Sequence, residues 1–386
     1  MDTATKFDLI MAPPTEEVLT EGDVKSALDI GLPLKHYIGF EISGLMHLGT
    51  GLVTAMKIAD LQKAGVDCSI FLADYHAWIN DKLGGDLDLI KKTAVNYYKD
   101  AFKKSLEVAG ADPDKVKFVL GSELYEKMGN DYWTTVLEVA KNVNLARIKR
   151  SITVAGRTEG ETINFAILMY PVMQVADIFA QQVNLAHSGA DQRKAHVIAR
   201  EVASHLKYSM PLKRKHGNHE DIYKPIALHH HLILGLQEPP IWPIPKDKLK
   251  ETISAMKMSK SKPNTAVFLT DSEENIKRKL MGAFCPPKHA EYNPVLDWAK
   301  TIIFKLNKEL TIERSAKFGG GLHFDDYKEL EKLYLEGKLH PMDLKNAVAD
   351  ELIDILAPIR KHFETPKNHQ MIEELERVTA GIKKPT

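Results

Sequence analysis

The chain has 386 residues, 27% of them charged and 44% hydrophobic, which is the balance of an ordinary globular protein with room for two or three domains. Its 52 basic and 52 acidic side chains cancel, so any binding to nucleic acid must depend on local basic patches. Two cysteines without metal-ligand spacing, no apolar run of about 18 residues and no signal-like core at Met1–Thr20 argue against disulfides, a membrane span and secretion, and favour a cytoplasmic protein.

The first third of the chain alternates strand-like and helix-like patterns. We expect strands at 36–42, 66–73 and 116–120, where apolar residues alternate with others or fill the segment. Helices are expected at 48–64 and 87–108, where apolar residues recur every three or four positions. This β-α-β-α-β order predicts an α/β fold with a doubly wound parallel sheet of the Rossmann type, which binds its ligands beyond the carboxyl ends of the strands.

The alternation continues up to a proline-rich boundary. Helices are expected at 163–181 and 191–206, and strands at 183–187 and 225–234. The stretch 237–245 contains four prolines and should interrupt regular structure. The sheet should therefore be complete before this boundary.

The last part of the chain is predicted to be helical. Apolar residues recur at three- and four-residue spacing between 344 and 359, which indicates a helix with one buried face, and Pro358 should kink or end it. The predicted domains are an N-terminal helical extension at 1–35, a Rossmann-like catalytic domain at 36–236 with a helical insertion at about 121–164, a linker at 237–268 and a C-terminal helical domain at 269–386.

The turn between the first predicted strand and helix, Ser43–Thr50, has the composition of a phosphate-binding site. Gly49 allows the backbone to approach a phosphate, and the helix N-terminus that follows offers free N–H groups. His47 can donate a hydrogen bond to phosphate oxygens as charge builds on the α-phosphorus. A single histidine at a turn is more often an ordinary surface residue, so this interpretation needs a second site.

A lysine-serine loop about 200 residues later provides that second site. Lys257 and Lys260 can hold the β- and γ-phosphates of ATP, and Ser259 and Ser261 add donors. A solvated loop is the plain alternative for such a run. Paired with the glycine-rich turn, however, the loop resembles the ATP signatures of class I aminoacyl-tRNA synthetases.

The first signature departs from that pattern at Thr50, where a second histidine is usual. Threonine keeps a hydrogen-bond donor but cannot carry a positive charge, so its phosphate role is transferred less firmly than that of His47. We expect Mg²⁺ to arrive with ATP, because no carboxylate cluster in the sequence has the pattern of a dedicated metal site.

Three polar residues mark one face of the apolar helix expected at 163–181. Tyr170, Gln174 and Asp177 are spaced i, i+4 and i+7, which places them on the same side. Such a stripe is either the solvated face of the helix or the lining of a cleft. The spacing alone favours the solvated face.

Seven motifs in a fixed order carry a wider resemblance. The chain resembles the archaeal and eukaryotic branch of the tyrosyl-tRNA synthetases, and the archaeal type very closely, from roughly Lys35 to Phe363. The motifs are Tyr37-Ile-Gly-Phe-Glu, Phe71-Leu-Ala-Asp-Tyr-His-Ala-Trp, Tyr170-Pro-Val-Met-Gln-Val-Ala-Asp, Gly189-Ala-Asp-Gln-Arg-Lys, Lys257-Met-Ser-Lys-Ser, Lys317-Phe-Gly-Gly and Leu339-His-Pro-Met-Asp-Leu-Lys-Asn-Ala-Val.

The resemblance implies a tyrosine–tRNA ligase, which joins L-tyrosine and ATP into tyrosyl-adenylate, releases pyrophosphate and transfers tyrosine to the 3′ end of tRNA(Tyr). It also implies how tyrosine is held. Asp177 and Tyr37 would contact its phenolic hydroxyl, and Tyr170, Gln174 and Gln192 its amino and carboxylate end. An Asp177 acceptor would explain the rejection of phenylalanine, which leaves that acceptor unpaired.

Other site residues follow from the residues or from the resemblance. Glu41 shares a strand face with Tyr37, so both can point into the cleft. The resemblance implies that Gly189 and Asp191 approach the ATP ribose, although Asp191 has a plain alternative as a helix N-cap.

The resemblance also assigns residues to tRNA and to a subunit contact. Phe318 would stack on an anticodon base while His340 and Asp343 read its edges, as unstacked RNA bases are recognised. Each has a plain alternative, in a core or at a helix start. The helical insertion would pair two subunits, which predicts a homodimer through Tyr132-Trp133 and the apolar positions of 136–145.

Three alternatives remain. A tryptophanyl-tRNA synthetase shares the fold and the loop, but Asp177 and Tyr37 argue against it because indole has no hydroxyl. A catalytically silent RNA-binding paralogue is disfavoured by the intact lysines, and a small-molecule nucleotidylyltransferase does not explain the C-terminal domain. The run His229-His230-His231 alternates faces on a strand, which disfavours a zinc site.

Overall fold

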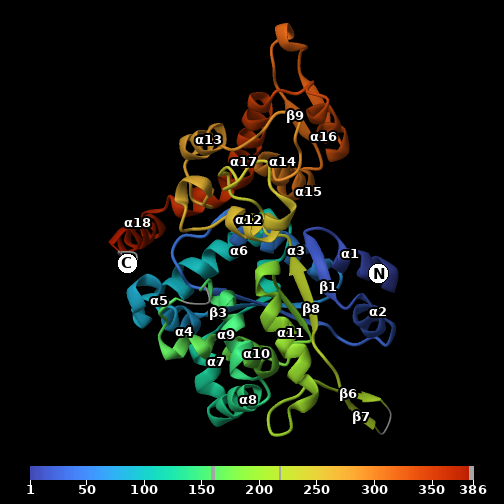
Figure 1. The fold of residues 1–386 in the computed structure, drawn as a ribbon, viewed down its shortest axis with the longest axis vertical. Coiled ribbons are helices and arrows are strands. Elements are labelled where there is room, and N and C mark those ends of the chain that lie inside the picture. The colour runs from blue at the N-terminus through green and yellow to red at the C-terminus, as the bar shows by residue number, and fades with distance from the viewer. Residues whose placement is uncertain (158–160, 217–218, 382–386) are drawn as a thin grey trace.

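The computed structural model describes residues 1–157, 161–216 and 219–381. A six-stranded sheet in the order β1-β8-β5-β2-β3-β4 runs through the middle of the molecule (Figure 1). From β8 through to β4 all neighbours are parallel, which confirms the predicted doubly wound α/β sheet. The strands are β1 (Thr15–Leu19), β2 (Lys35–Glu41), β3 (Asp67–Ala73), β4 (Val116–Leu120), β5 (Leu185–Gly189) and β8 (Ile226–His230).

The N-terminal segment differs from the helical extension predicted for it. Its helices α1 (Thr3–Met11) and α2 (Glu21–Asp29) flank β1, which joins the sheet edge antiparallel to β8. The strand reads Thr-Glu-Glu-Val-Leu and lacks the alternation that identified the other strands. The buried Lys57 ammonium also ties α1 to the body, because it donates to the carbonyls of Leu9 at 2.8 Å and Ala12 at 3.0 Å.

Helices cover the sheet where the sequence predicted them, with local differences. The helix expected at 48–64 begins with a π-helical turn at Gly49–Val53, and the helix expected at 87–108 contains a second such turn at Ala94–Tyr98. The hairpin β6 (Lys213–His216) and β7 (His219–Ile222) and the short α4 (Asp74–Ile79) were not predicted. The other helices here are α3 (Thr54–Lys63), α5 (Leu87–Thr93), α6 (Lys99–Val108), α7 (Gly121–Met128), α8 (Asn130–Lys141), α9 (Leu145–Ser151), α10 (Tyr170–Ala180) and α11 (Arg193–Val202).

The C-terminal part is mostly helical and stands above the sheet in Figure 1. Pro358 lies inside α17 but does not end it, because the apolar face of that helix is buried on both sides of the proline. The elements are α12 (Leu249–Met256), α13 (Glu273–Met281), α14 (Pro294–Trp298), α15 (Phe304–Leu306), β9 (Leu310–Ile312), β10 (Leu322–Phe324), α16 (Tyr327–Leu335), α17 (Pro341–Phe363) and α18 (Pro366–Gly381). Within the described ranges, no helix is long and apolar enough to cross a membrane.

The last helix, α18, packs back onto the sheet-bearing half of the molecule. Lys92 pairs with Glu374 at 2.8 Å, and Leu375 is buried in the same core cluster as the sheet. Gly44, in the predicted phosphate-binding turn, has φ of +101°, and a β-carbon there would lie 3.3 Å from Thr379 Oγ1. The C-terminal helix therefore packs directly against the turn between β2 and α3.

Buried histidines connect the strands of the sheet. His36 Nε2 lies 3.0 Å from His187 Nδ1, and His187 Nε2 lies 2.8 Å from His230 Nδ1. On the α11 side, His196 Nδ1 lies 3.1 Å from His229 Nε2. Burial lowers the pKa of His36 and His196 to about 3 and that of His230 to about 4, so these imidazoles are neutral in the folded protein.

This histidine network should make the protein sensitive to acid. A folded pKa below the unfolded value near 6.5 gives stability that is present above that pH and lost as the pH falls. Each such histidine should lower the free energy of unfolding by about 1.4 kcal/mol per pH unit well below pH 6.5. The free energy of unfolding can be measured by urea denaturation at several pH values. Its change per pH unit should be smaller by about this amount in His196→Gln than in the wild type.

The comparison between variants cancels the contribution of the carboxyl groups, including those whose raised pKa changes the free energy of unfolding with pH in the opposite direction. Asp177, for example, has a raised pKa and contributes equally to both proteins. Parallel pH profiles for the wild type and His196→Gln would contradict the interpretation.

Candidate active site

The two predicted phosphate-binding segments meet beyond the carboxyl ends of the strands. Leu48 N–H donates to Val267 O at 3.0 Å, which joins the turn after β2 to the chain that follows the lysine-serine loop. Met258 N–H donates to Ile233 O at 3.0 Å, which anchors the start of the loop to the segment after β8. The loop is therefore held at both ends beside the turn.

His47 lies in the turn with its ring bonded to Thr50. Thr50 N–H donates to His47 Nδ1 at 3.3 Å, and Thr50 Oγ1 lies 3.3 Å from Nε2. A neutral ring whose Nδ1 accepts must carry its proton on Nε2, which can then act as a donor. Burial, followed by the charges of Lys260 and Lys257, lowers the pKa of His47 and keeps the ring neutral.

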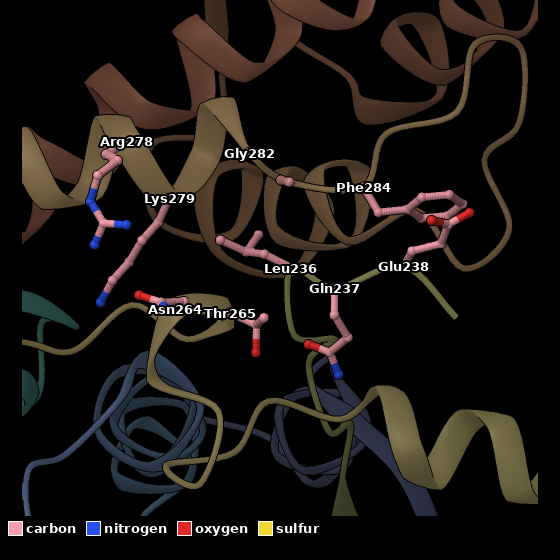
Figure 2. A pocket seen from close by; sticks show the side chains of 10 residues that line it. Leu236, Gln237, Glu238, Asn264, Thr265, Arg278, Lys279, Gly282 and Phe284 are labelled. Carbon is pink, nitrogen blue, oxygen red and sulfur yellow. The ribbon is translucent and has the colours of Figure 1, made fainter. Parts of the chain in front are cut away.

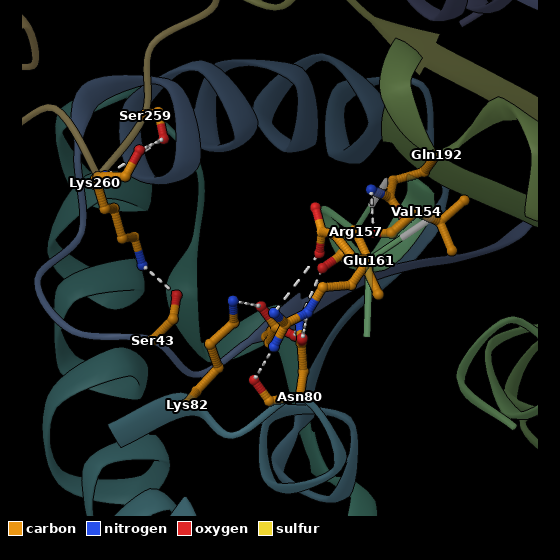
Figure 3. Close-up of polar contacts among 12 residues, drawn as sticks. Ser43, Asn80, Lys82, Val154, Arg157, Glu161, Gln192, Ser259 and Lys260 are labelled. Carbon is orange, nitrogen blue, oxygen red and sulfur yellow. Dashed lines mark hydrogen bonds and ion pairs between the residues drawn. The ribbon is translucent and has the colours of Figure 1, made fainter. Parts of the chain in front are cut away.

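Lys260 extends from the loop to the turn (Figure 3). Its Nζ donates to Ser43 Oγ at 3.2 Å and to Tyr98 Oη at 2.6 Å. Tyr98 comes from the π-helical turn between α5 and α6, and its oxygen also accepts from Ser43 N–H at 3.0 Å. Ser259 and Ser261 bond to each other, with 2.9 Å between their hydroxyl oxygens. No motif pointed to Tyr98.

Lys257 reaches the other side of the site, at the end of β5. Its Nζ donates to Asp191 Oδ2 at 2.8 Å. Asp191 caps no helix in the structure, so its plain alternative as an N-cap is not supported. A β-carbon on Gly189 would lie 2.6 Å from Leu232 and 2.9 Å from Asp191 Oδ1, so only glycine keeps this turn close to both.

Asp177 lies at the bottom of a second, adjoining cluster. It is 1% exposed, so it does not lie on the solvated helical face that the spacing alone favoured. Its Oδ1 accepts hydrogen bonds from Tyr125 and Tyr132, both at 3.0 Å, and its Oδ2 lies 3.6 Å from His76 Nε2. Burial raises the pKa of Asp177 to about 8, and the two tyrosine hydroxyls act in the opposite direction. Sequence reasoning missed Tyr125 and gave Tyr132 a different role.

β2 forms one wall of this cluster. Tyr37 is buried beside Asp177: burial, followed by the Asp177 charge, raises the pKa of its phenol. Gly39 stays exposed although it lies in the middle of a central strand, so the space over it is open. A β-carbon on Gly39 would lie 3.3 Å from the Tyr37 hydroxyl oxygen.

Amides and a carboxylate gather at the other end of this space. Gln174 Nε2 donates to Gln192 Oε1 at 3.1 Å, and Gln192 Nε2 donates to the Val154 carbonyl at 3.0 Å. Tyr170 is buried, and the nearby Glu41 carboxylate, after burial itself, raises the pKa of its phenol. In the described part of the chain Gln174 Oε1 has no hydrogen-bond partner, so a buried acceptor is left for a ligand.

Glu41 belongs to a polar network with Asn80, Lys82 and Arg157, and these three partners are labelled in Figure 3. Asn80 Nδ2 donates to Glu41 Oε1 at 2.6 Å and to the Ala155 carbonyl at 2.8 Å. Arg157 Nε donates to Asn80 Oδ1 at 2.8 Å, and Lys82 Nζ lies 3.4 Å from Glu41 Oε2. Burial raises the pKa of Glu41, while Lys82 and Asn80 oppose the shift.

Comparisons with known proteins agree with this geometry. The family model of the class I tRNA synthetases (W and Y) matches residues 31–357. The tyrosine–tRNA ligase of Thermococcus kodakarensis is 58% identical over 379 residues, which cover 97% of this chain and 99% of the relative. The crystal structure of the tyrosyl-tRNA synthetase from Pyrococcus horikoshii, complexed with L-tyrosine, matches with a TM-score of 0.92 and 55% identity over 98% of this chain and 100% of that one. The chain belongs to the archaeal-type tyrosyl-tRNA synthetases.

This synthetase is a tyrosine–tRNA ligase, and ATP is a substrate of its family. A tryptophanyl-tRNA synthetase from Aeropyrum pernix matches with a TM-score of 0.61 but only 19% identity, so that likeness shows the fold alone. The tryptophan alternative is therefore replaced by the tyrosine assignment.

The predicted anticodon residues of the synthetase lie in the C-terminal part. Phe318 is 64% exposed in the loop between β9 and β10, and His340 Nδ1 caps α17 by accepting from Met342 N–H at 3.1 Å. Arg314 links the two places, because it donates to the carbonyls of Gly320 at 2.6 Å and Lys338 at 3.1 Å. Asp343 lies in the first turn of α17. Phe318 is therefore no core residue, whereas His340 keeps a capping role.

A cavity of about 460 Å³ adjoins the loop but contains none of the predicted site residues (Figure 2). It lies between the chain after the lysine-serine loop, at Asn264 and Thr265, and α13, where Arg278 and Lys279 face it. Among the described residues, one group has metal-ligand spacing, and it is exposed on the β9–β10 hairpin at Glu309, His323 and Asp325. Neither feature belongs to the cluster around Asp177.

Filling the open space over β2 should weaken tyrosine binding. In Gly39→Ala the added methyl would crowd the Tyr37 ring, and overpacking of this kind costs about 1–3 kcal/mol. The KM for tyrosine in pyrophosphate exchange should rise roughly tenfold or more while the KM for ATP stays within about twofold. Gly22→Ala in α2, where the methyl would meet only Thr20 Oγ1 at 3.7 Å, is the control. An unchanged KM for tyrosine would place the substrate elsewhere.

Proposed function

We propose that the synthetase forms tyrosyl-adenylate in the adjoining clusters around Asp177 and His47, and then passes the tyrosyl group to the 3′ end of tRNA(Tyr). The observation that carries this assignment is the buried Asp177 carboxylate at the bottom of a cluster whose far side reaches the lysine-serine loop. Asp177 and Tyr37 receive the phenolic hydroxyl. Tyr170, Gln174, Gln192 and Glu41 hold the amino and carboxylate end. Because phenylalanine lacks the hydroxyl, it leaves the buried acceptor unpaired.

The activation step needs positioning and charge neutralisation more than proton transfer. The tyrosine carboxylate attacks the α-phosphorus in line, the bond to the bridging oxygen breaks, and pyrophosphate leaves. His47 donates from Nε2 to the α-phosphate, with Thr50 beside it, while Lys257 and Lys260 hold the leaving phosphates. Gly49 and Gly189 leave room for the nucleotide, Asp191 approaches the ribose, and Ser259 and Ser261 add donors.

The lysines must exchange partners for this step. Lys260 now donates to Ser43 and Tyr98, and Lys257 to Asp191. A triphosphate offers Lys260 charged acceptors in place of two hydroxyls, and it offers Lys257 several negative charges in place of the single Asp191 carboxylate. ATP binding should therefore draw both lysines away from these contacts. We propose that Mg²⁺ enters with ATP as part of the substrate, and that the enzyme works in the cytoplasm.

The phosphate roles can be tested by tyrosine-dependent ATP–pyrophosphate exchange. His47→Ala and Lys260→Ala should each lower the exchange rate by about 10²–10³-fold, because each removes a donor from the charge that develops in the transition state. Tyrosine affinity, measured by equilibrium dialysis, should change by less than about threefold. Exchange rates equal to those of the wild type would refute the assigned roles.

We propose that residues 269–386 form the anticodon-binding domain, with 36–236 as the catalytic domain, 121–164 as its insertion and 237–268 as the linker. The exposed Phe318 ring supports stacking on an anticodon base, and Arg314 holds its loop close to His340 and Asp343.

Variants at Phe318 and His340 should separate charging from activation. Phe318→Ala should raise the KM for tRNA(Tyr) by about 5- to 100-fold, because stacking on one base contributes roughly 1–3 kcal/mol, and should leave pyrophosphate exchange unchanged. His340→Asn keeps a capping side chain for α17 but removes the imidazole, so it should weaken tRNA binding without lowering thermal stability. A KM for tRNA equal to that of the wild type in both variants would show that this surface does not bind the anticodon.

The insertion supports a homodimer. Trp133 and Leu137 on α8 are 45% and 66% exposed, and Leu145 at the start of α9 is also exposed. Tyr132 and Val136 are buried inside the subunit, so they are unavailable for the subunit contact predicted for them. We propose that the exposed residues pair with a second copy, a state that sedimentation of the purified protein would detect.

A further inference from the structure

The environment of Asp177 is asymmetric, and this asymmetry carries an inference beyond the assignments above. Its Oδ1 accepts from two hydroxyls, those of Tyr125 and Tyr132, each at 3.0 Å. In the described part of the chain, Oδ2 has no hydrogen bond, only the 3.6 Å contact with His76 Nε2. One oxygen of the carboxylate is therefore saturated by the protein, and the other is left to accept from something else.

The two hydroxyls are held rigidly. The rings of Tyr125 and Tyr132 stack with 3.9 Å between their centroids and 24° between their planes, and both side chains are buried. They come from different helices, α7 and α8, while Asp177 comes from α10. Three elements of the fold therefore converge on one carboxylate oxygen.

We infer that Tyr125 and Tyr132 are positioning residues for tyrosine selection, which fix Asp177 so that Oδ2 faces the incoming phenol. The inference rests on the proposed role of Asp177 as the hydroxyl acceptor. The paired hydroxyls stop the carboxylate from turning. They also stabilise its ionised form, which accepts a hydrogen bond from the substrate hydroxyl. They touch Asp177 rather than the substrate, so they act through that residue.

Other ionisable groups also face this carboxylate. They are Tyr37 on β2, and His76 and Asp74 on α4. Burial lowers the pKa of His76 to about 4, so His76 is neutral and cannot replace the tyrosines as a source of positive charge. The nearby Asp74 raises the pKa of Asp177, so its effect also opposes ionisation. The two tyrosine hydroxyls are therefore the groups that favour the ionised carboxylate.

The test uses Tyr125→Phe and Tyr132→Phe, which remove only the hydroxyls. Each should raise the KM for tyrosine in pyrophosphate exchange roughly tenfold, as expected for the loss of a hydrogen bond to a charged group, and lower the preference for tyrosine over phenylalanine. The pH profile of kcat/KM for tyrosine should also change. Its rising limb, which reports the free enzyme, should move to higher pH in both variants. A purely structural role would lower thermal stability without moving this limb.

Two controls keep the outcomes distinct. Tyr334→Phe removes a hydroxyl that is equally buried but lies in the C-terminal part, where it donates to Pro286 O at 2.9 Å, and it should leave both the KM and the pH profile unchanged. Asp177→Asn tests the underlying assignment. If Asp177→Asn leaves the KM for tyrosine unchanged, the proposed acceptor is wrong. If Asp177→Asn raises the KM for tyrosine, but neither Tyr125→Phe nor Tyr132→Phe alters this KM or the pH profile, only the positioning role is overturned.

Discussion

The desolvation of Asp177 is the constraint on which the substrate cluster depends. The ionised form of an almost completely buried carboxylate has lost its hydration, so burial raises the pKa of Asp177, and hydrogen-bond donors that replace the water favour the ionised form. Tyr125 and Tyr132 provide two such donors. In the binding mode proposed here, a tyrosine substrate provides a third donor, whereas phenylalanine provides none. Under that proposal, selectivity arises from an unfavourable buried charge that only the correct ligand fully relieves.

The predicted phosphate-binding half has the opposite arrangement, because its charged groups are partly solvated. Lys257 and Lys260 lie on a loop anchored at both ends, and each has a protein partner that it can exchange for phosphate. This half depends on packing from a distant part of the chain, since α18 lies against Gly44 and the sheet shares its core with the C-terminal helices. Removing the C-terminal helices would therefore also expose the turn that is predicted to bind ATP.

The sequence was sufficient for the parallel sheet, and it marked the two segments that the structure brings together, because apolar periodicity and glycine-rich turns are local signals. It was insufficient where tertiary contacts decide. β1 has no alternating pattern, and it forms a strand only because it pairs antiparallel with β8 at the edge of the sheet. Spacing alone favoured a solvated face for the stripe Tyr170, Gln174 and Asp177, because spacing cannot reveal that α7 and α8 cover Asp177. Tyr125 and Tyr98 belong to no motif, and only the fold brings their hydroxyls to Asp177 and Lys260.

Thr50, the one departure from the ATP signature, is consistent with the electrostatics of the turn. Burial and two nearby lysines already keep the His47 imidazole neutral, and a second imidazole beside it would be exposed to the same lysine charges. A histidine at position 50 would then contribute a hydrogen-bond donor rather than a charge, and threonine contributes a donor as well. With His47 Nε2 donating its proton to the α-phosphate, as proposed, the Thr50 hydroxyl 3.3 Å away keeps its own proton for another phosphate oxygen. In the proposed activation step, Lys257 and Lys260 provide the positive charge at the triphosphate, so the turn can lose its second histidine without losing the chemistry.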